Sequence, residues 1–262
     1  MEFLHAMGWG YVVSGFVVGT LVGLTGVGGG SLMTPILILI FGIQPVAAVG
    51  TDLLYAAATK SAGSLVHGFN RMIDWRVVGR LSLGSVPAAA VMLVVLHFLG
   101  ITGGTANVLV SKVLGVALLF TSAALVFRRQ LLSAYADRVG SLDVRRTRNY
   151  TILTGVILGV LVSTTSVGAG ALGITALILL YPKLPIAKIA GSDIAHAVPL
   201  TLVSGAGHWL LGSVNLALLG ALLMGSLPGI ILGSALAPRV PDASLRIVLA
   251  CVLALVGAKL LF

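Results

Sequence analysis

The sequence predicts an all-α integral membrane protein built from two inverted-topology repeats of about five helices each. Its composition, an internal repeat and the distribution of charge between loops support this prediction. Of 262 residues, 58% are hydrophobic and 9% are charged, compared with roughly 25% charged residues in a soluble domain. The mean hydropathy is +1.12. Because a soluble fold of this size cannot bury so much apolar surface, we expect a lipid bilayer to surround most of the chain.

Apolar segments bounded by glycine, proline or charge are expected to be helices, because a chain in lipid must satisfy its own backbone hydrogen bonds. They are 10–24, 31–42, 45–67, 76–99, 105–127, 150–164, 171–181, 186–209, 214–236 and 243–261. The first two segments of each half span only about 16–23 Å at about 1.5 Å per residue, against a hydrocarbon core of about 30 Å. We therefore expect the first two helices of each repeat to be short and to form a hairpin.

The two halves of the sequence repeat one another. At an offset of 140 residues, Gly19, Val22, Thr25, Val27, Gly28, Gly30, Leu32 and Pro45 match Gly159, Val162, Thr165, Val167, Gly168, Gly170, Leu172 and Pro185. At an offset of 141, Gly50, Asp52, Ala56, His67, Gly79, Gly84, Ser85 and Pro87 match Gly191, Asp193, Ala197, His208, Gly220, Gly225, Ser226 and Pro228. We assign the first transmembrane repeat to 1–127, a basic cytoplasmic linker to 128–149 and the second repeat to 150–262.

Corresponding loops of the two halves differ in charge. In each pair, one loop contains basic residues and the other contains none. Arg71, Arg76 and Arg80 correspond to the segment 210–215, which lacks Lys and Arg. Lys183 and Lys188 correspond likewise to 43–45, and Arg239 and Arg246 to 100–104. Because Lys and Arg mark cytoplasmic loops, this difference predicts that the halves have opposite orientations. The arginine-rich linker then lies in the cytoplasm, and both termini lie outside it.

The formal charge of +9 does not indicate nucleic-acid binding, because the basic residues occupy short loops rather than one broad face. The first ten residues contain no Lys or Arg, so we expect no cleaved signal peptide. The single cysteine, Cys251, excludes an intrachain disulfide and a thiol metal cluster. We expect no cofactor and no metal.

A glycine-rich stretch stands at the tip of the first expected hairpin. It reads Thr25-Gly26-Val27-Gly28-Gly29-Gly30-Ser31 and precedes a short helix. Adjacent glycines can direct backbone N–H groups at an anion, and the helix dipole adds positive potential. A nucleotide-binding P-loop is excluded because no lysine follows and no soluble sheet is present. The alternative is that these glycines only allow close helix packing.

Hydroxyl side chains replace part of this glycine cluster in the second half. The stretch contains Thr164, Thr165, Ser166, Gly168 and Gly170. Hydroxyls can donate to an oxyanion, so the two tips together are expected to surround a small anion. The alternative is that each hydroxyl bonds back to the preceding helical turn.

Ionisable residues recur inside the apolar segments, where an unpaired charge costs several kcal/mol. Asp52 and Asp193 occupy equivalent positions and are expected to orient the hairpins or to carry a coupled proton. Lys60 is expected either to attract the anion or to neutralise an aspartate. His67, His196 and His208 are candidates for a proton relay or for structural contacts.

The order of these motifs resembles the sulfite exporter TauE/SafE family of membrane permeases. The resemblance is carried by Gly-x-Gly-Gly-Gly, Gly50-Thr51-Asp52-Leu53, Asp74-Trp75, Gly84-Ser85-x-Pro87 and the run from Gly191 to Leu200. It implies transport of sulfite or organosulfonates across the bacterial inner membrane. Ala169 replaces a glycine of the first tip, and Thr175 stands where the first half has Pro35, so the two tips are expected to bind unequally.

The function expected from these observations is a secondary transporter that exports a small sulfur-containing anion by alternating access. An anion channel and a proton-coupled uptake permease are the alternatives. An intramembrane enzyme is not expected, because no H-E-x-x-H motif or clustered nucleophile with a base is present. The sequence does not determine the oligomeric state, and a homodimer is one of the alternatives.

Overall fold

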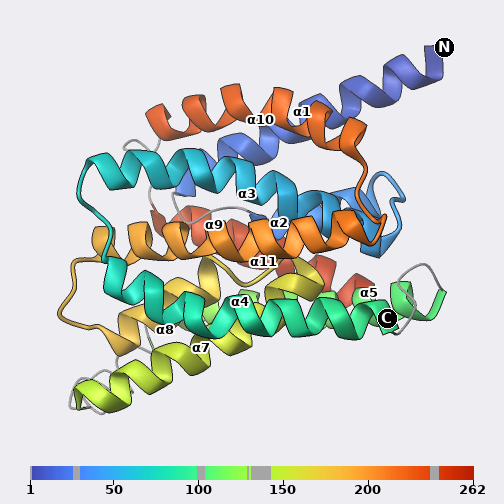
Figure 1. The fold of residues 1–262 in the computed structure, drawn as a ribbon. Helices are drawn as coiled ribbons and strands as arrows, with labels where there is room; N and C mark the ends of the chain where they lie inside the picture. The colour runs from blue at the N-terminus through green and yellow to red at the C-terminus, as the bar shows by residue number, and fades with distance from the viewer. Residues whose placement is uncertain (1, 26–29, 99–103, 129, 131–142, 237–241) are drawn as a thin grey trace.

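The architecture is helical throughout the part of the chain that the structure describes (Figure 1). The structure is a computed structural model that describes all residues except 1, 26–29, 99–103, 129, 131–142 and 237–241. The helices are α1 (Glu2–Thr25), α2 (Gly30–Leu39), α3 (Pro45–Phe69), α4 (Trp75–Phe98), α5 (Gly104–Val126), α7 (Val144–Thr165), α8 (Ala171–Leu180), α9 (Ile186–Leu210), α10 (Leu216–Leu236) and α11 (Asp242–Leu261). The all-helical prediction is confirmed.

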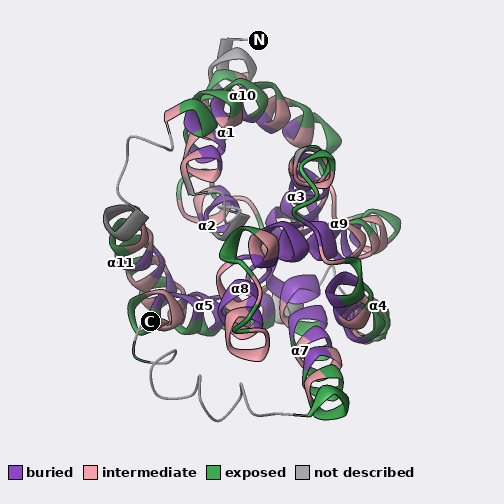
Figure 2. Ribbon diagram, turned by 90° about the vertical axis from the view of Figure 1, so that its left-hand side faces the viewer, coloured by how far each residue is buried: buried purple, intermediate pink, exposed green. Residues whose placement is uncertain are grey.

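Four of the described helices are long and apolar enough to cross a bilayer. They are α4, residues Asn107–Val126 of α5, α9 and α10. Large apolar side chains lie on the outside of the bundle, where Phe98 is 82% exposed and Ile231 is 73% exposed. Figure 2 shows that the buried residues face the centre and the exposed ones face outward. This distribution is expected for helices surrounded by lipid.

The prediction that the first two helices of each repeat are short is wrong for the first helix of each pair. α1 has 24 residues and α7 has 22, whereas α2 and α8 have 10 each. The error at α7 arose because charged residues were taken as its boundary. Asp143 caps this helix by accepting a hydrogen bond from the Val144 N–H at 2.8 Å, and α7 begins inside the expected linker.

Two pairs of helices pack unusually closely, α1 against α10 and α4 against α7. A Cβ atom at Gly19 of α1 would overlap the backbone oxygen of Ser226 in α10, and one at Gly159 of α7 would overlap that of Ser85 in α4. Neighbouring contacts in the two helix pairs also correspond through the sequence repeat. The contact of Gly15 with Leu222 corresponds to that of Gly155 with Leu81. The contact of Gly225 with Val12 corresponds to that of Gly84 with Ile152. Each close pair therefore combines one helix from each half of the sequence.

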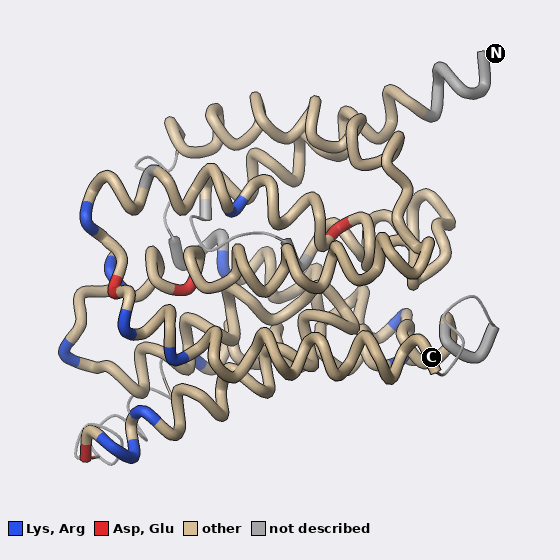
Figure 3. Tube along the Cα trace, in the orientation of Figure 1, with Lys and Arg blue, Asp and Glu red and all other residues tan. Residues whose placement is uncertain are grey.

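Basic residues gather at one end of the bundle, on the left of Figure 3. Hydrogen bonds join the segments there: Arg80 donates to the Tyr181 hydroxyl at 3.1 Å, and the Asp74 N–H donates to Ser192 Oγ at 2.8 Å. We call this the basic end. The N- and C-termini lie at the opposite end (Figures 1 and 3).

α3 and α9, which occupy equivalent positions in the two halves, pack in opposite directions. Gly50 near the start of α3 faces His208 near the end of α9. Gly191 near the start of α9 faces the Met72 carbonyl just beyond the end of α3. The chain therefore approaches the basic end along α3 and leaves it along α9.

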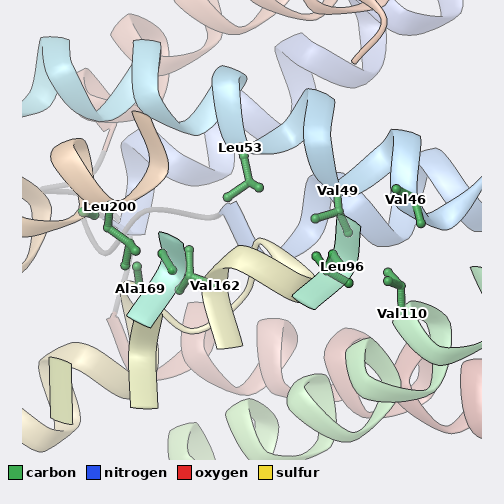
Figure 4. Close-up of a cluster of buried hydrophobic side chains, with 10 residues drawn as sticks. Val46, Val49, Leu53, Leu96, Val110, Val162, Ala169 and Leu200 are labelled. Atoms are coloured by element: carbon green, nitrogen blue, oxygen red, sulfur yellow. The ribbon is translucent and has the colours of Figure 1, made fainter. Parts of the chain in front are cut away.

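A central cluster of apolar residues holds α3, α4, α5, α7 and α9 together. Its members are Val46, Val49, Leu53, Ala89, Leu96, Val110, Val162, Ala169, Ala197 and Leu200. Figure 4 shows Ala169, in the connection between α7 and α8, beside Leu200 and Val162. The apolar core thus encloses the connection in which the sequence places half of the candidate site.

Candidate functional site

The connection between α7 and α8 is buried and turns sharply within a few residues. We call residues 163–170 the second tip. Ser166 ends α7 in the left-handed region with φ of 59°, and Gly168 and Gly170 have φ of 120° and 125°. Gly170 precedes α8 and no side chain caps that helix. Glycine is required at positions 168 and 170 because a Cβ atom strongly disfavours these backbone angles.

Most hydroxyls of the second tip are already used by the backbone. Thr164 Oγ1 donates to the Val160 carbonyl at 2.8 Å, and Thr165 Oγ1 donates to the Leu161 carbonyl at 2.6 Å. Neither hydroxyl can donate to an anion without leaving this bond. The back-bonding alternative therefore describes these two residues in this conformation.

Ser166 is the exception among these hydroxyls. Its side chain is buried, and its Oγ makes no hydrogen bond with any part of the chain that the structure describes. The hydroxyl lies near the Asp52 carboxyl group. Ser166 is therefore the hydroxyl of the second tip that remains available to an added group.

The first tip lies largely outside the described residues. Gly28 and Gly29 are among the undescribed positions. Thr25 ends α1, and Gly30 and Ser31 begin α2, but the side chains of Thr25 and Ser31 are not described. The anion-binding role of these five residues stays a prediction.

Asp52 connects α3 to the short helix α2. Its Oδ2 accepts hydrogen bonds from the Thr34 hydroxyl at 2.5 Å and from the Thr34 N–H at 3.2 Å. The side chain is 0% exposed, and its Oδ1 has no hydrogen-bond partner among the described residues. Two donors on one oxygen hold the carboxyl group in a fixed position against α2.

Asp193 occupies the equivalent position on α9 but has different contacts. Its carboxyl group packs on the Cα atom of Gly173 in α8, where a Cβ atom would overlap its Oδ1. The Gly170 N–H lies near the carboxyl group, and the side chain is 1% exposed. Its Oδ1 lacks a hydrogen-bond partner among the described residues. Asp193 therefore stands at the N-terminus of α8 with one oxygen unused.

Lys60 reaches from α3 to the second tip. Its ammonium group donates to the Ala169 carbonyl oxygen at 3.1 Å, and the side chain is 8% exposed. Electrostatic attraction links Lys60 to Asp193 and to Asp52. One buried cation thus lies within reach of both buried carboxylates and of the tip.

The three histidines have separate environments. His196 Nε2 lies 2.8 Å from Ser85 Oγ in α4, and His208 Nε2 donates to the Ser163 carbonyl at 2.9 Å. His67 lines a cavity near the end of α3. Only His208 contacts the second tip directly, and the three imidazoles do not form a continuous chain of hydrogen bonds in the described part of the molecule.

A cavity of about 540 Å³ adjoins Lys60. It is lined by α1, α3, α9 and α10, and its polar lining comes from Thr59, Lys60, His67 and Ser234. Along α3 it extends from Ala56 to His67, in the last turn before the basic end. Its volume lies within the range of about 300–1,000 Å³ typical of small-molecule sites.

A comparison with known protein families found one that matches nearly the whole chain. The family model described as sulfite exporter TauE/SafE matches residues 11–260. The chain belongs to this family. The resemblance seen in the motifs is therefore confirmed, and the protein is a multi-pass membrane protein of a transporter family. No solved structure matches the chain significantly.

Curated relatives of the TauE/SafE chain carry the names of transporters. It is 36% identical to the probable membrane transporter protein YjnA of Bacillus subtilis (strain 168), over 95% of this chain and 98% of that protein. It is 26% identical to the probable membrane transporter protein YdhB of the same organism, over 94% and 97% of the two chains. A relative in Methanocaldococcus jannaschii, the probable membrane transporter protein MJ0441, is 26% identical over 95% and 94%.

Sequence reasoning missed several contacts of this TauE/SafE site. Thr34 was not singled out, although the second half has Thr175 at the offset of 141 residues that also relates Asp52 to Asp193. The Ala169 carbonyl was missed because a backbone acceptor leaves no signal in residue type. Ser85 was identified only as part of the internal repeat and of the Gly84-Ser85-x-Pro87 motif, yet its hydroxyl contacts His196.

Proposed function

We propose that this TauE/SafE transporter binds a small sulfur-containing anion, sulfite or an organosulfonate, beside Lys60 and the second tip. The observation that carries the proposal is the hydrogen bond from the Lys60 ammonium to the Ala169 carbonyl. A neutral carbonyl is a weaker partner for a buried ammonium than an anionic oxygen is. An entering anion can therefore replace this carbonyl at Lys60.

The surroundings of Lys60 support an anion rather than a cation. The N-terminus of α8, which no side chain caps, directs the positive end of its dipole toward the tip. The unpartnered Ser166 hydroxyl adds a neutral donor. Lys60 and the N-terminus of α8 both attract negative charge, which Asp193 supplies in the empty protein and which a bound anion would supply in its place.

Alternating access between inverted repeats is the proposed mechanism. Two observations support an inverted repeat. α3 and α9 pack antiparallel, and the α1–α10 contacts correspond to the α4–α7 contacts through the sequence repeat. We assign the basic end to the cytoplasm and both termini to the outside by the positive-inside rule. The cavity beside Lys60 extends toward the basic end, which favours loading from the cytoplasm and hence export.

Flux through liposomes that contain the purified chain tests the proposal. Sulfite and sulfoacetate should cross these vesicles and not protein-free vesicles, with a rate that saturates as the anion concentration rises. If neither anion crosses, the proposed substrate class is wrong. Single-channel currents in planar bilayers would instead favour the anion channel over a carrier.

A further inference from the structure

The buried triad Asp52, Lys60 and Asp193 does not balance its own charge. All three side chains are at most 8% exposed. The described residues of the second tip and of α8 contain no charged side chain. When all three groups are ionised, the triad carries one net negative charge before any substrate arrives. Binding a monoanion beside Lys60 would raise this to two negative charges within the membrane, which is electrostatically unfavourable.

We propose that each anion crosses together with one proton, and that Asp193 is the residue that takes up and releases this proton. The proposal rests on the anion transport proposed above. Protonation of one carboxylate returns the occupied triad to a single negative charge, the same as in the empty carrier. Anion and proton then bind in a mutually dependent way, because each removes the electrostatic cost of the other.

Asp52 is a poorer candidate for this proton because its carboxylate is already stabilised. Both the hydroxyl and the N–H of Thr34 donate to one of its oxygens. Donated hydrogen bonds favour the ionised form of a carboxyl group. Asp52 is therefore less suited to proton exchange than Asp193, and its bonds to Thr34 keep α2 attached to α3.

Asp193 meets the requirements for an exchangeable site. Its Oδ1 is buried and has no hydrogen-bond partner in the described part of the chain. It lies near Lys60 and stands at the N-terminus of α8. An anion at the second tip competes with Asp193 for the Lys60 ammonium and for the Gly170 N–H. Protonation of Asp193 releases both groups to the anion.

Other ionisable groups around Asp193 come from α3, from α9 itself and from the start of α4. α3 contributes Asp52, Lys60 and, near Gly191, His67. On α9 itself His196 lies one turn away, with its Nε2 on Ser85 of α4. Near the start of α4, the Asp74 N–H binds Ser192, and the Asp74 carboxyl group binds the N–H of Arg76.

Co-transport of one proton with a monoanion makes the cycle electrically neutral. Net movement then follows the anion gradient and the pH gradient and does not depend on the membrane potential. In proteoliposomes, the fluxes of two anions are compared. One is sulfoacetate, at a pH where the sulfoacetate carries its full charge, and the other is the monoanion methanesulfonate. Methanesulfonate flux should be accompanied by about one proton per anion, measured with an internal pH dye, and should not respond to a potassium diffusion potential. Methanesulfonate flux driven by the potential without proton movement would overturn the proposal.

Variants of the two carboxylates test the assignment to Asp193. Folding of D193N and D52N is first verified by size-exclusion chromatography and thermal unfolding in detergent. Folded D193N should exchange methanesulfonate across the vesicle membrane without moving protons, and D193E should restore proton movement. D52N is the matched control and should keep proton movement in any anion flux that remains. A folded D193N that still moves protons, or one that no longer exchanges the anion, would refute the assignment.

Failure of this inference can be separated from failure of the proposed function. If wild-type vesicles transport neither methanesulfonate nor sulfite nor sulfoacetate, the anion-transport proposal itself is wrong. If they transport an anion but no proton, only the proton-coupling proposal is wrong. If D193N does not fold, D193E decides, because moving the carboxyl group by one methylene should shift the pH profile of methanesulfonate flux. An unshifted profile would count against Asp193.

Discussion

The Lys60 ammonium group donates a hydrogen bond to the Ala169 carbonyl oxygen at 3.1 Å, which joins the middle of α3 to the connection between α7 and α8. Residues from the two halves of the sequence thus meet at one buried cation. Ala169 also belongs to the central apolar cluster, so the carbonyl is held by packing as well as by this bond.

Replacing Lys60 by methionine should abolish binding of the sulfur anion. The variant keeps the length and the apolar stem of the side chain but removes the charge that we assign to anion attraction. Binding of sulfite to the purified protein, followed by isothermal titration, provides the measurement. Lys112→Met is the matched control, because Lys112 is exposed on α5. Unchanged binding in Lys60→Met would show that this lysine only balances an aspartate.

Replacing Thr34 by valine should weaken the attachment of α2 to α3. The change removes the hydroxyl that binds Asp52 and leaves a buried carboxylate with one donor fewer, at a cost of about 1–3 kcal/mol. Thermal unfolding in detergent should detect the loss. Thr154→Val serves as control, because the Thr154 hydroxyl is exposed and binds only the preceding turn at Tyr150. Equal stability of the two variants would argue against a structural role for the Thr34–Asp52 contact.

Replacing Gly168 by alanine should destabilise the second tip through its backbone alone. The nearest atoms to an added Cβ lie at 3.7 Å, so space is available, but φ is 120°. Backbone strain of this kind costs about 1–3 kcal/mol. Gly212→Ala tests the milder left-handed angle of 74° in open space and should cost less. The difference between their unfolding temperatures measures the strain, and the absence of any difference would contradict this account.

Replacing Gly19 or Gly159 by alanine should have similar effects, although the residues lie in different halves. In each case the Cβ atom would overlap a backbone carbonyl of the partner helix, so the two helices must separate. Overpacking of this kind costs about 1–3 kcal/mol. Gly220→Ala adds a methyl group within α10 where nothing lies within 4 Å, and it should be neutral or stabilising. Unequal losses in the two interface variants would indicate that the packing of the halves is not equivalent.

Helix positions were largely predictable because the bilayer imposes long apolar runs with polar boundaries. The expected segment 186–209 corresponds closely to α9, Ile186–Leu210. The same rule failed for α7, whose first turns are polar because they extend beyond the apolar run. Arg145 and Arg146 are exposed there, and the helix continues through them. Hydropathy marks where a helix is apolar, and the cap at Asp143 marks where it begins.

The composition of the site was less predictable than its place in the chain. Repetition of Asp52 and Asp193 indicated equivalent positions, but their partners differ, since one binds Thr34 and the other packs on Gly173. This difference depends on which side chain faces each carboxylate across the hairpin, and no periodic pattern encodes it. The anion-binding role of the tips remains a prediction. The sulfur in the proposed substrate comes from the family and not from a contact.

The close contact between α1 and α10 has a consequence for how the chain is made. α1 precedes α10 along the chain, yet α1 packs on glycines of α10 as far as Gly233. Long-range contacts of this kind form slowly and late. During synthesis α1 must therefore remain in the bilayer without its partner while the helices from α2 to α9 are translated. The α1–α10 pair can form only after α10 has entered the bilayer.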